Sequence, residues 1–175
     1  MRWLSLVLLG LVALGMACES NGGTPMAKDK PPPAPPLHDG DVVKRVLRAE
    51  QAGENLLKPD AWRPWQKGFA REGELFVCNN GADAKVQRGV SQTVTLDQER
   101  PEPIIAVAWS KAEGVGGGSN SDYSLYLDLV YTDGTPLWGQ ISPFGVGTHD
   151  WQRRQVVVFP AKPVKSLSFH MLLRR

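Results

Sequence analysis

Aromatic, acidic and amide side chains alternate with apolar residues between Asp122 and Trp151. Because successive side chains of a strand point to opposite faces, the leucines of this stretch would share one face and the polar residues the other. Aromatic rings can cover the CH faces of a sugar ring, while carboxylates, amides and guanidinium groups bond its hydroxyls. The pattern predicts a binding face rather than an active site. Its expected residues are Tyr126, Asp128, Trp138, Gln140, Arg153 and Gln155.

The two strands of this stretch are expected to form a hairpin around an Asp-Gly turn. A three-residue loop from Asp133 to Thr135 would pair Leu127 with Ile141 and Asp128 with Gln140, which keeps like side chains together. This register would bring the exposed aromatic and amide groups of both strands onto one surface. Arg153 and Gln155 join that surface if their strand lies alongside.

Catalytic patterns are not evident. The three histidines, His38, His149 and His170, stand in the spacer, in a turn and in a strand, with no metal-ligand spacing or nucleophile motif linking them. His149 beside Asp150 is expected to close a turn. We therefore predict a protein without catalytic residues, metal or cofactor.

The rest of the chain reads as an all-β domain of short strands separated by turn-rich joints, which is typical of an antiparallel sandwich. The expected strands are Glu74 to Asn79, Lys85 to Leu96, Ile104 to Lys111, Asp122 to Thr132, Leu137 to Phe144, Trp151 to Phe159 and Lys165 to Leu173.

The N-terminal region reads as an export leader and a spacer. Residues 1–17 have the length and polarity of a signal peptide, and Cys18 is placed as the acylated residue of a lipoprotein, although ordinary signal cleavage also fits. Residues 18–40 form a Pro-rich linker, and 41–53 a short helix with an apolar stripe. Residues 54–175 form the sandwich. If Cys18 is acylated, Cys78 is a lone, half-buried thiol; otherwise a bridge between the two is open.

Charge favours no nucleic-acid partner. The formal net charge is +2, and the basic residues are scattered rather than gathered into a stripe. The expected location is the cell envelope, as a lipid-anchored protein, or else the periplasm or the medium. The lipid anchor would be the sole contact with a membrane.

From Asn55 onward the chain resembles the CenC-type carbohydrate-binding modules. The matching features are Asn55-Leu56-Leu57, a Trp at 62 or 65, the strands VSQTV (90–94) and AVAWSK (106–111), THDWQ (148–152) and the terminal SLSFHMLL. The resemblance implies a galactose-binding-like jelly-roll and non-catalytic binding of a polysaccharide or other glycan, as an accessory to a secreted hydrolase. The family's calcium-binding Asn-Gly-x-Phe-Glu opening is replaced by Pro59-Asp60-Ala61-Trp62, which leaves Asp60 as a weak calcium candidate. The alternative prediction is a structural or protein-interaction sandwich.

Overall fold

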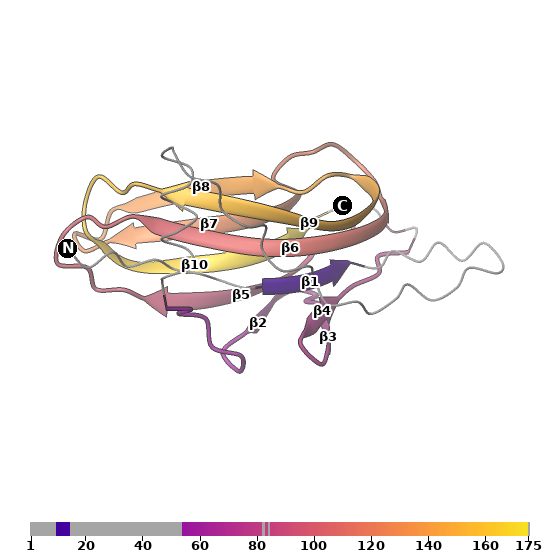
Figure 1. Ribbon diagram of the computed structural model, residues 1–175, viewed down its shortest axis with the longest axis horizontal. Coiled ribbons are helices and arrows are strands. Elements are labelled where there is room, and N and C mark those ends of the chain that lie inside the picture. Colours follow the sequence, from indigo (N-terminus) through magenta and orange to yellow (C-terminus); the bar gives the residue numbers. More distant parts are fainter. Residues whose placement is uncertain (1–9, 15–53, 82, 84, 175) are drawn as a thin grey trace, which may run out of the picture.

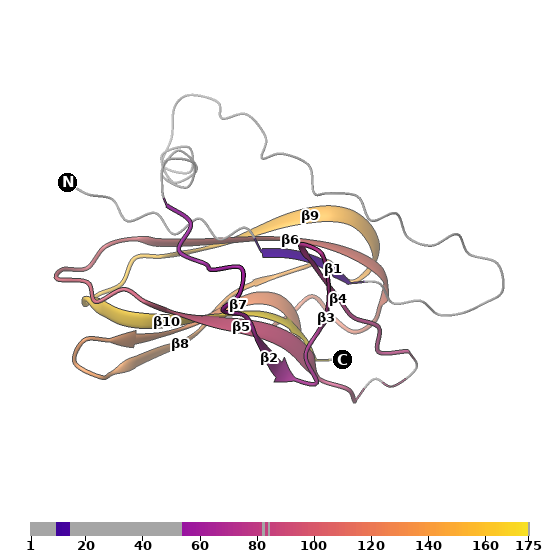
Figure 2. The same cartoon turned by 90° about the horizontal axis from the view of Figure 1, so that it is seen from below.

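The described chain is a sandwich of two five-stranded sheets. The computed structural model describes residues 10–14, 54–81, 83 and 85–174. Sheet A has the order β3-β4-β1-β6-β9 and sheet B the order β2-β5-β10-β7-β8, and the two lie as separate layers (Figures 1 and 2). The strands of sheet A are β1 (Gly10–Leu14), β3 (Ala70–Glu72), β4 (Leu75–Val77), β6 (Ile104–Val115) and β9 (Gly147–Val158). Those of sheet B are β2 (Arg63–Gln66), β5 (Arg88–Thr95), β7 (Tyr123–Tyr131), β8 (Pro136–Pro143) and β10 (Val164–Leu173).

The predicted all-β antiparallel sandwich is confirmed. Each of the seven expected strands has a counterpart, because alternation and turn residues mark strands well. Three short strands were not expected: β1, which lies within the expected leader, and β2 and β3, whose polar and proline-containing sequences carry no alternation. β9 begins at Gly147, so Thr148, His149 and Asp150 lie in a strand rather than in a turn.

Pairing is antiparallel except at β1, which runs parallel to both β4 and β6. In sheet B, β10 is hydrogen-bonded to β5 on one side and to β7 on the other. The final strand of the sequence is therefore central, and it carries the residues that join the two halves of this sheet.

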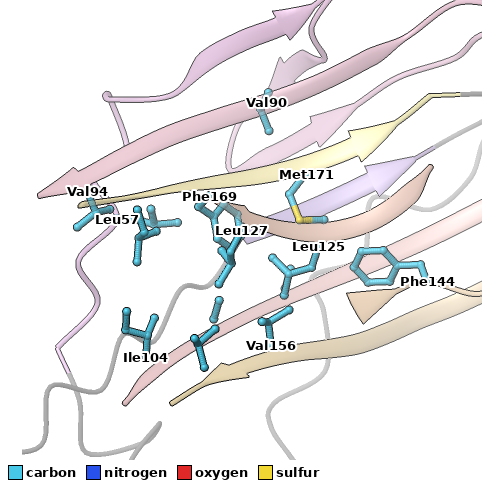
Figure 3. Packing of buried hydrophobic residues seen from close by; sticks show 14 of the residues in the cluster. Leu57, Val90, Val94, Ile104, Leu125, Leu127, Phe144, Val156, Phe169 and Met171 are labelled. Atoms are coloured by element: carbon cyan, nitrogen blue, oxygen red, sulfur yellow. The ribbon is translucent and has the colours of Figure 1, made fainter. Parts of the chain in front are cut away.

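The core lies between the inner faces of the two sheets. Sheet B contributes the odd-numbered residues Leu125, Leu127 and Leu129, each with no exposed surface, and Phe169 and Met171 lie beside them on the neighbouring β10 (Figure 3). Strict alternation on β7 produces this face, as the sequence predicts. The same alternation leaves Tyr126 and Asp128 on the outer face.

The described domain is entered through a pinned loop. Leu57 is buried in the core cluster, together with Val94 of β5 and Ile104 at the start of β6 (Figure 3). The next residue, Lys58, exchanges two hydrogen bonds with the buried amide of Gln92, at 2.7 and 2.9 Å. The backbone of Lys58 is thus fixed to β5 of sheet B.

Several predictions concern residues outside the described part of the chain. These are the leader cleavage, Cys18 acylation, the 18–40 linker and the 41–53 helix, which stay predictions. No helix within the described ranges is both long and apolar enough to span a bilayer.

Candidate functional site

The outer face of sheet B brings several polar and aromatic side chains together, which we call the β7–β10 face. On it, Tyr126 is paired with His170 and Asp128 with Ser168 across the β7/β10 ladder. A row of hydroxyl side chains continues the face onto β5, where Thr93 is hydrogen-bonded to Ser168 at 3.1 Å. The face is rich in hydrogen-bonding groups.

A β-bulge in β8 shapes one border of this face. Leu127 is paired with Gln140 and Leu129 with Leu137, so β8 has one extra residue between the two pairs. The bulge is held by Gly139, which has φ +70° and whose N–H donates to an Asp128 carboxylate oxygen at 2.9 Å. It leaves Trp138 59% exposed beside the β7–β10 face.

The expected hairpin register is wrong by two residues between the turn and the bulge, and by one residue past the bulge. The loop is closed by Tyr131 and Thr135, whose backbones are hydrogen-bonded at 2.8 Å, whereas the expected loop would be flanked by Thr132 and Pro136. Past the bulge, Gln140 is opposite Leu127 and therefore turns toward the inner side, while Ile141 is opposite Tyr126 and is 40% exposed. The extra residue changes which β8 side chain faces out, because the side-chain period is two.

Two of the predicted binding residues lie on the other layer of the sandwich. Arg153 and Gln155 belong to β9 and are paired with Trp109 and Val107 of β6, on the outer face of sheet A. The guanidinium of Arg153 lies 5.8 Å from the centre of the Trp109 ring and bonds Gln155 at 2.9 Å. The structure thus brings together Tyr126, Asp128 and Trp138 and separates the β9 pair from them.

Electrostatics single out a cluster of four residues on the β7–β10 face. The Tyr126 ring packs edge-on against His170 at 5.8 Å, and the Arg174 guanidinium lies 5.8 Å from the Tyr126 ring centre. Burial, followed by the negative charge and hydrogen bond of Asp128, raises the pKa of Tyr126. Burial lowers the pKa of His170, opposed in part by Asp128, so this imidazole is neutral at neutral pH.

Sequence reasoning missed three contributors to this side of sheet B. His170 and Arg174 belong to the final strand and its end, where they lie next to Tyr126 only because β10 inserts beside β7. Ile141 was assigned to the core face. Alternation within SLSFHMLL points His170 to the other face of the strand from Phe169. The sequence could therefore predict that His170 faces outward, but it could not predict which strand lies beside it.

The described residues hold no group of three or more His, Cys, Asp or Glu side chains arranged to bind a metal. Cys78 is buried, and desolvation raises its pKa to about 12, so it is a packed thiol rather than a nucleophile. His149 bonds the carbonyl oxygens of Asp150 and Gly145, and the Asp150 carboxylate bonds Lys111. That pair is structural.

Comparison with known proteins gives a different functional setting. The chain is 32% identical over 114 residues, 63% of its length, to the tRNA nuclease WapA of Bacillus subtilis (strain 168). It has the same identity over the same length to a tRNA3(Ser)-specific nuclease WapA of Bacillus spizizenii and a tRNA(Glu)-specific nuclease WapA of Bacillus subtilis subsp. natto. The matched part makes up 5% of each relative. No family model and no solved structure matches the chain.

These findings overturn the functional expectations drawn from the sequence. The relatives are named tRNA nucleases, not carbohydrate-binding modules. The predicted resemblance to carbohydrate-binding modules is therefore wrong. So are the predictions of a glycan partner, of no enzymatic role and of no nucleic-acid partner. The lipoprotein and the alternative structural role gain no support from them either. The physical reason is that an aromatic and hydroxyl-rich sheet face suits a nucleobase as well as a sugar ring, since both offer a flat surface with polar edges.

Proposed function

We propose that this chain is part of a nuclease that acts on tRNA, and that its β7–β10 face contacts the RNA. The similarity to proteins named tRNA nucleases supports the RNA setting. The chain spans 5% of the length of those relatives, so what is proposed for it is the contact with RNA. The observation that carries the proposal to this face is Trp138, an exposed indole at the border of the polar β7–β10 face.

Single-stranded RNA is recognised by stacking unstacked bases on aromatic side chains of a sheet surface, with cations tracking the phosphates. Trp138 is placed to stack on a base, and Ile141 beside it adds an apolar contact. The Arg174 guanidinium lies 5.8 Å from the Tyr126 ring centre, contacts the Ser121 carbonyl oxygen and the Asp122 carboxylate, and supplies positive charge for a phosphate. The hydroxyls of Thr93 and Ser168 offer donors and acceptors to a ribose 2′-hydroxyl.

The cluster also contains a proton acceptor. RNA cleavage through the 2′-hydroxyl needs a base to remove its proton, and a histidine with a lowered pKa is unprotonated and ready for that role at neutral pH. His170 has the lowered pKa that this role requires, and because its Nδ1 is buried, Nε2 is the nitrogen assigned to accept the proton. We assign His170 as the candidate base of the β7–β10 face.

The experiment is binding of fluorescein-labelled tRNA and of a short single-stranded RNA, measured by anisotropy, with cleavage followed on denaturing gels. Removing a base-stacking ring costs about 1–3 kcal/mol, so we expect Trp138→Ala to weaken binding about 5- to 150-fold. Phe159→Ala is the matched control, because Phe159 is a 67% exposed ring that follows β9 of sheet A. We expect His170→Gln to slow cleavage without an equal loss of binding.

Two results would contradict the proposed RNA contact. A folded wild-type chain that binds neither RNA at low salt would sink the proposal. Equal affinity of Trp138→Ala and Phe159→Ala would remove the β7–β10 face from it. Binding should also weaken with salt, with a slope of about 0.7 per phosphate contacted.

A further inference from the structure

The edge strand β2 carries a second tryptophan and an arginine on the outer side of sheet B. Arg63 is paired with Ser91 of β5, and Trp65 with Gly89. Ser91 is in turn paired with His170 of β10. Residues that are directly opposite in a ladder point to the same side of a sheet, so Arg63 and Trp65 lie on the same side as His170. We call these two residues the β2 pair.

Gly89 allows the strands beside Trp65 to pack closely. A Cβ at residue 89 would lie 2.6 Å from the Met171 carbonyl oxygen, 3.0 Å from Leu172 Cδ2 and 3.4 Å from Trp65 Cβ. The first of these distances is too short for real atoms, so any larger residue would force β5 and β10 apart. Trp65 lies in this closely packed corner and is half-buried, which leaves part of its indole accessible.

Trp65 and Trp138 lie at opposite borders of sheet B. The strand order β2-β5-β10-β7-β8 separates them by four strand spacings, with His170 on the central strand. At about 4.8 Å for each spacing, the separation is about 19 Å. Nucleotides stacked as in a duplex advance by about 3.4 Å each, so about five or six stacked steps would cover this distance. The two indoles therefore cannot contact one base or two adjacent stacked bases.

We propose that the β2 pair is a second base-binding subsite, and that the outer side of sheet B binds an unpaired RNA segment crossing the strands from Trp138 to Trp65. This inference rests on the function proposed above and names the class of RNA that the same face takes. The bases of an A-form stem are stacked on one another, whereas an unpaired segment can turn its bases onto aromatic rings. A segment of about four to seven nucleotides reaches both indoles, depending on how far its bases are splayed apart.

Arg63 supplies positive charge for the backbone of this segment. Its side chain is exposed, and Nη1 donates to the carbonyl oxygens of Trp62 and Asp60, at 3.0 and 3.4 Å. These bonds hold the guanidinium at the start of β2 and use one of its three nitrogens, so the others can bond a phosphate. The Asp128 carboxylate accepts from the Gly139 N–H at the β8 border, three strands from Arg63. Its negative charge therefore does not oppose a phosphate at the β2 pair.

The test measures the affinity of the full chain for unpaired RNA oligonucleotides of increasing length, from about two to about ten nucleotides. Wild-type affinity should rise with length until both indoles are occupied and level off beyond that length. Trp65→Ala should bind the longest oligonucleotide about 5- to 150-fold more weakly, the effect of losing one stacking ring, with little change for the shortest. A purely structural role for Trp65 would not depend on RNA length.

Conservative variants separate stacking from packing. Trp65→Phe keeps a ring and should retain most of the affinity, whereas Trp65→Leu keeps only apolar bulk and should not. Urea unfolding of each variant confirms that it is folded, so the comparison of Phe with Leu remains decisive if Trp65→Ala fails to fold. Arg63→Gln should lower the slope of log affinity against log salt by about 0.7, the value for one phosphate. Phe159→Ala is again the control and should change neither affinity nor slope.

The outcomes distinguish this subsite from the RNA contact itself. If Trp65→Leu binds as tightly as wild type at every length while Trp138→Ala weakens binding, the second subsite is disproved and the contact at Trp138 stands. A fully paired RNA stem that competes as well as the unpaired oligonucleotide would also overturn the inference. If the folded wild type binds no RNA of any length, both the inference and the proposed function fail.

Discussion

Gly139→Ala tests whether the β8 bulge positions the RNA-contacting surface. Gly139 has φ +70°, and an added Cβ would lie 3.6 Å from the Tyr126 hydroxyl, an ordinary contact. The cost is therefore backbone strain alone, about 1–2 kcal/mol for a residue with a Cβ in the left-handed region. For a domain of this size, each kcal/mol lowers the thermal midpoint by about 2 to 8 °C.

Gly134→Ala is the matched control for this substitution. Gly134 has φ +83° with nothing within 4 Å of an added Cβ, so its strain is the same, but it belongs to the hairpin loop. Both variants should lose similar stability in urea. In Gly139→Ala we expect the backbone strain to be relieved by breaking the hydrogen bond from the residue 139 N–H to Asp128, which would move the neighbouring Trp138. RNA affinity should therefore fall about 10-fold or more in Gly139→Ala but not in Gly134→Ala.

Asparagine tolerates the left-handed region better than alanine, so Gly139→Asn should recover part of both losses. Equal RNA affinity of the Gly139→Ala and Gly134→Ala variants, measured by anisotropy at matched folded fraction, would refute the reasoning. The bulge would then be a feature of folding alone.

Three further outcomes are expected. The buried Ser110 and Tyr123 hydroxyls are hydrogen-bonded to each other, so Ser110→Ala and Tyr123→Phe should each lower the free energy of unfolding in urea by about 1–3 kcal/mol. The double variant should lose much less than the sum of the two, and additive losses would disprove the pairing. Cys78, with its pKa raised to about 12, should resist iodoacetamide at pH 8 in the folded chain and react in urea; mass spectrometry showing rapid labelling of the folded chain would contradict this. Because burial lowers the pKa of His170 in the folded chain, the unfolded chain binds a proton at this residue at a higher pH than the folded chain does. The free energy of unfolding should therefore be highest above about pH 6.5, the ordinary histidine pKa, and should fall as the pH drops from there toward the lowered pKa of the folded state. His170→Gln should flatten this part of the pH profile of the thermal midpoint, and an unchanged slope would exclude His170 as its source.

The candidate site was predicted in part. Tyr126 and Asp128 could be placed on an outer face because alternation along β7 is strict and local. Trp138 was expected on the same surface and lies at its rim, though through a bulge that the sequence reveals only as Gly139. His170 and Arg174 join them by β10 pairing with β7, a contact between distant parts of the chain that no local pattern specifies.

The sequence by itself determined the all-β class, the seven main strands and the inward residues of β7, because these follow from periodicity and turn chemistry within a few residues. Strand order across the sheets required the tertiary structure. That order placed Arg153 on the other sheet from Tyr126 and placed His170 next to Tyr126. Strand pairing depends on how two whole sheet faces pack over one core. Local alternation states which side a residue faces, whereas packing of the two layers decides which residues meet there.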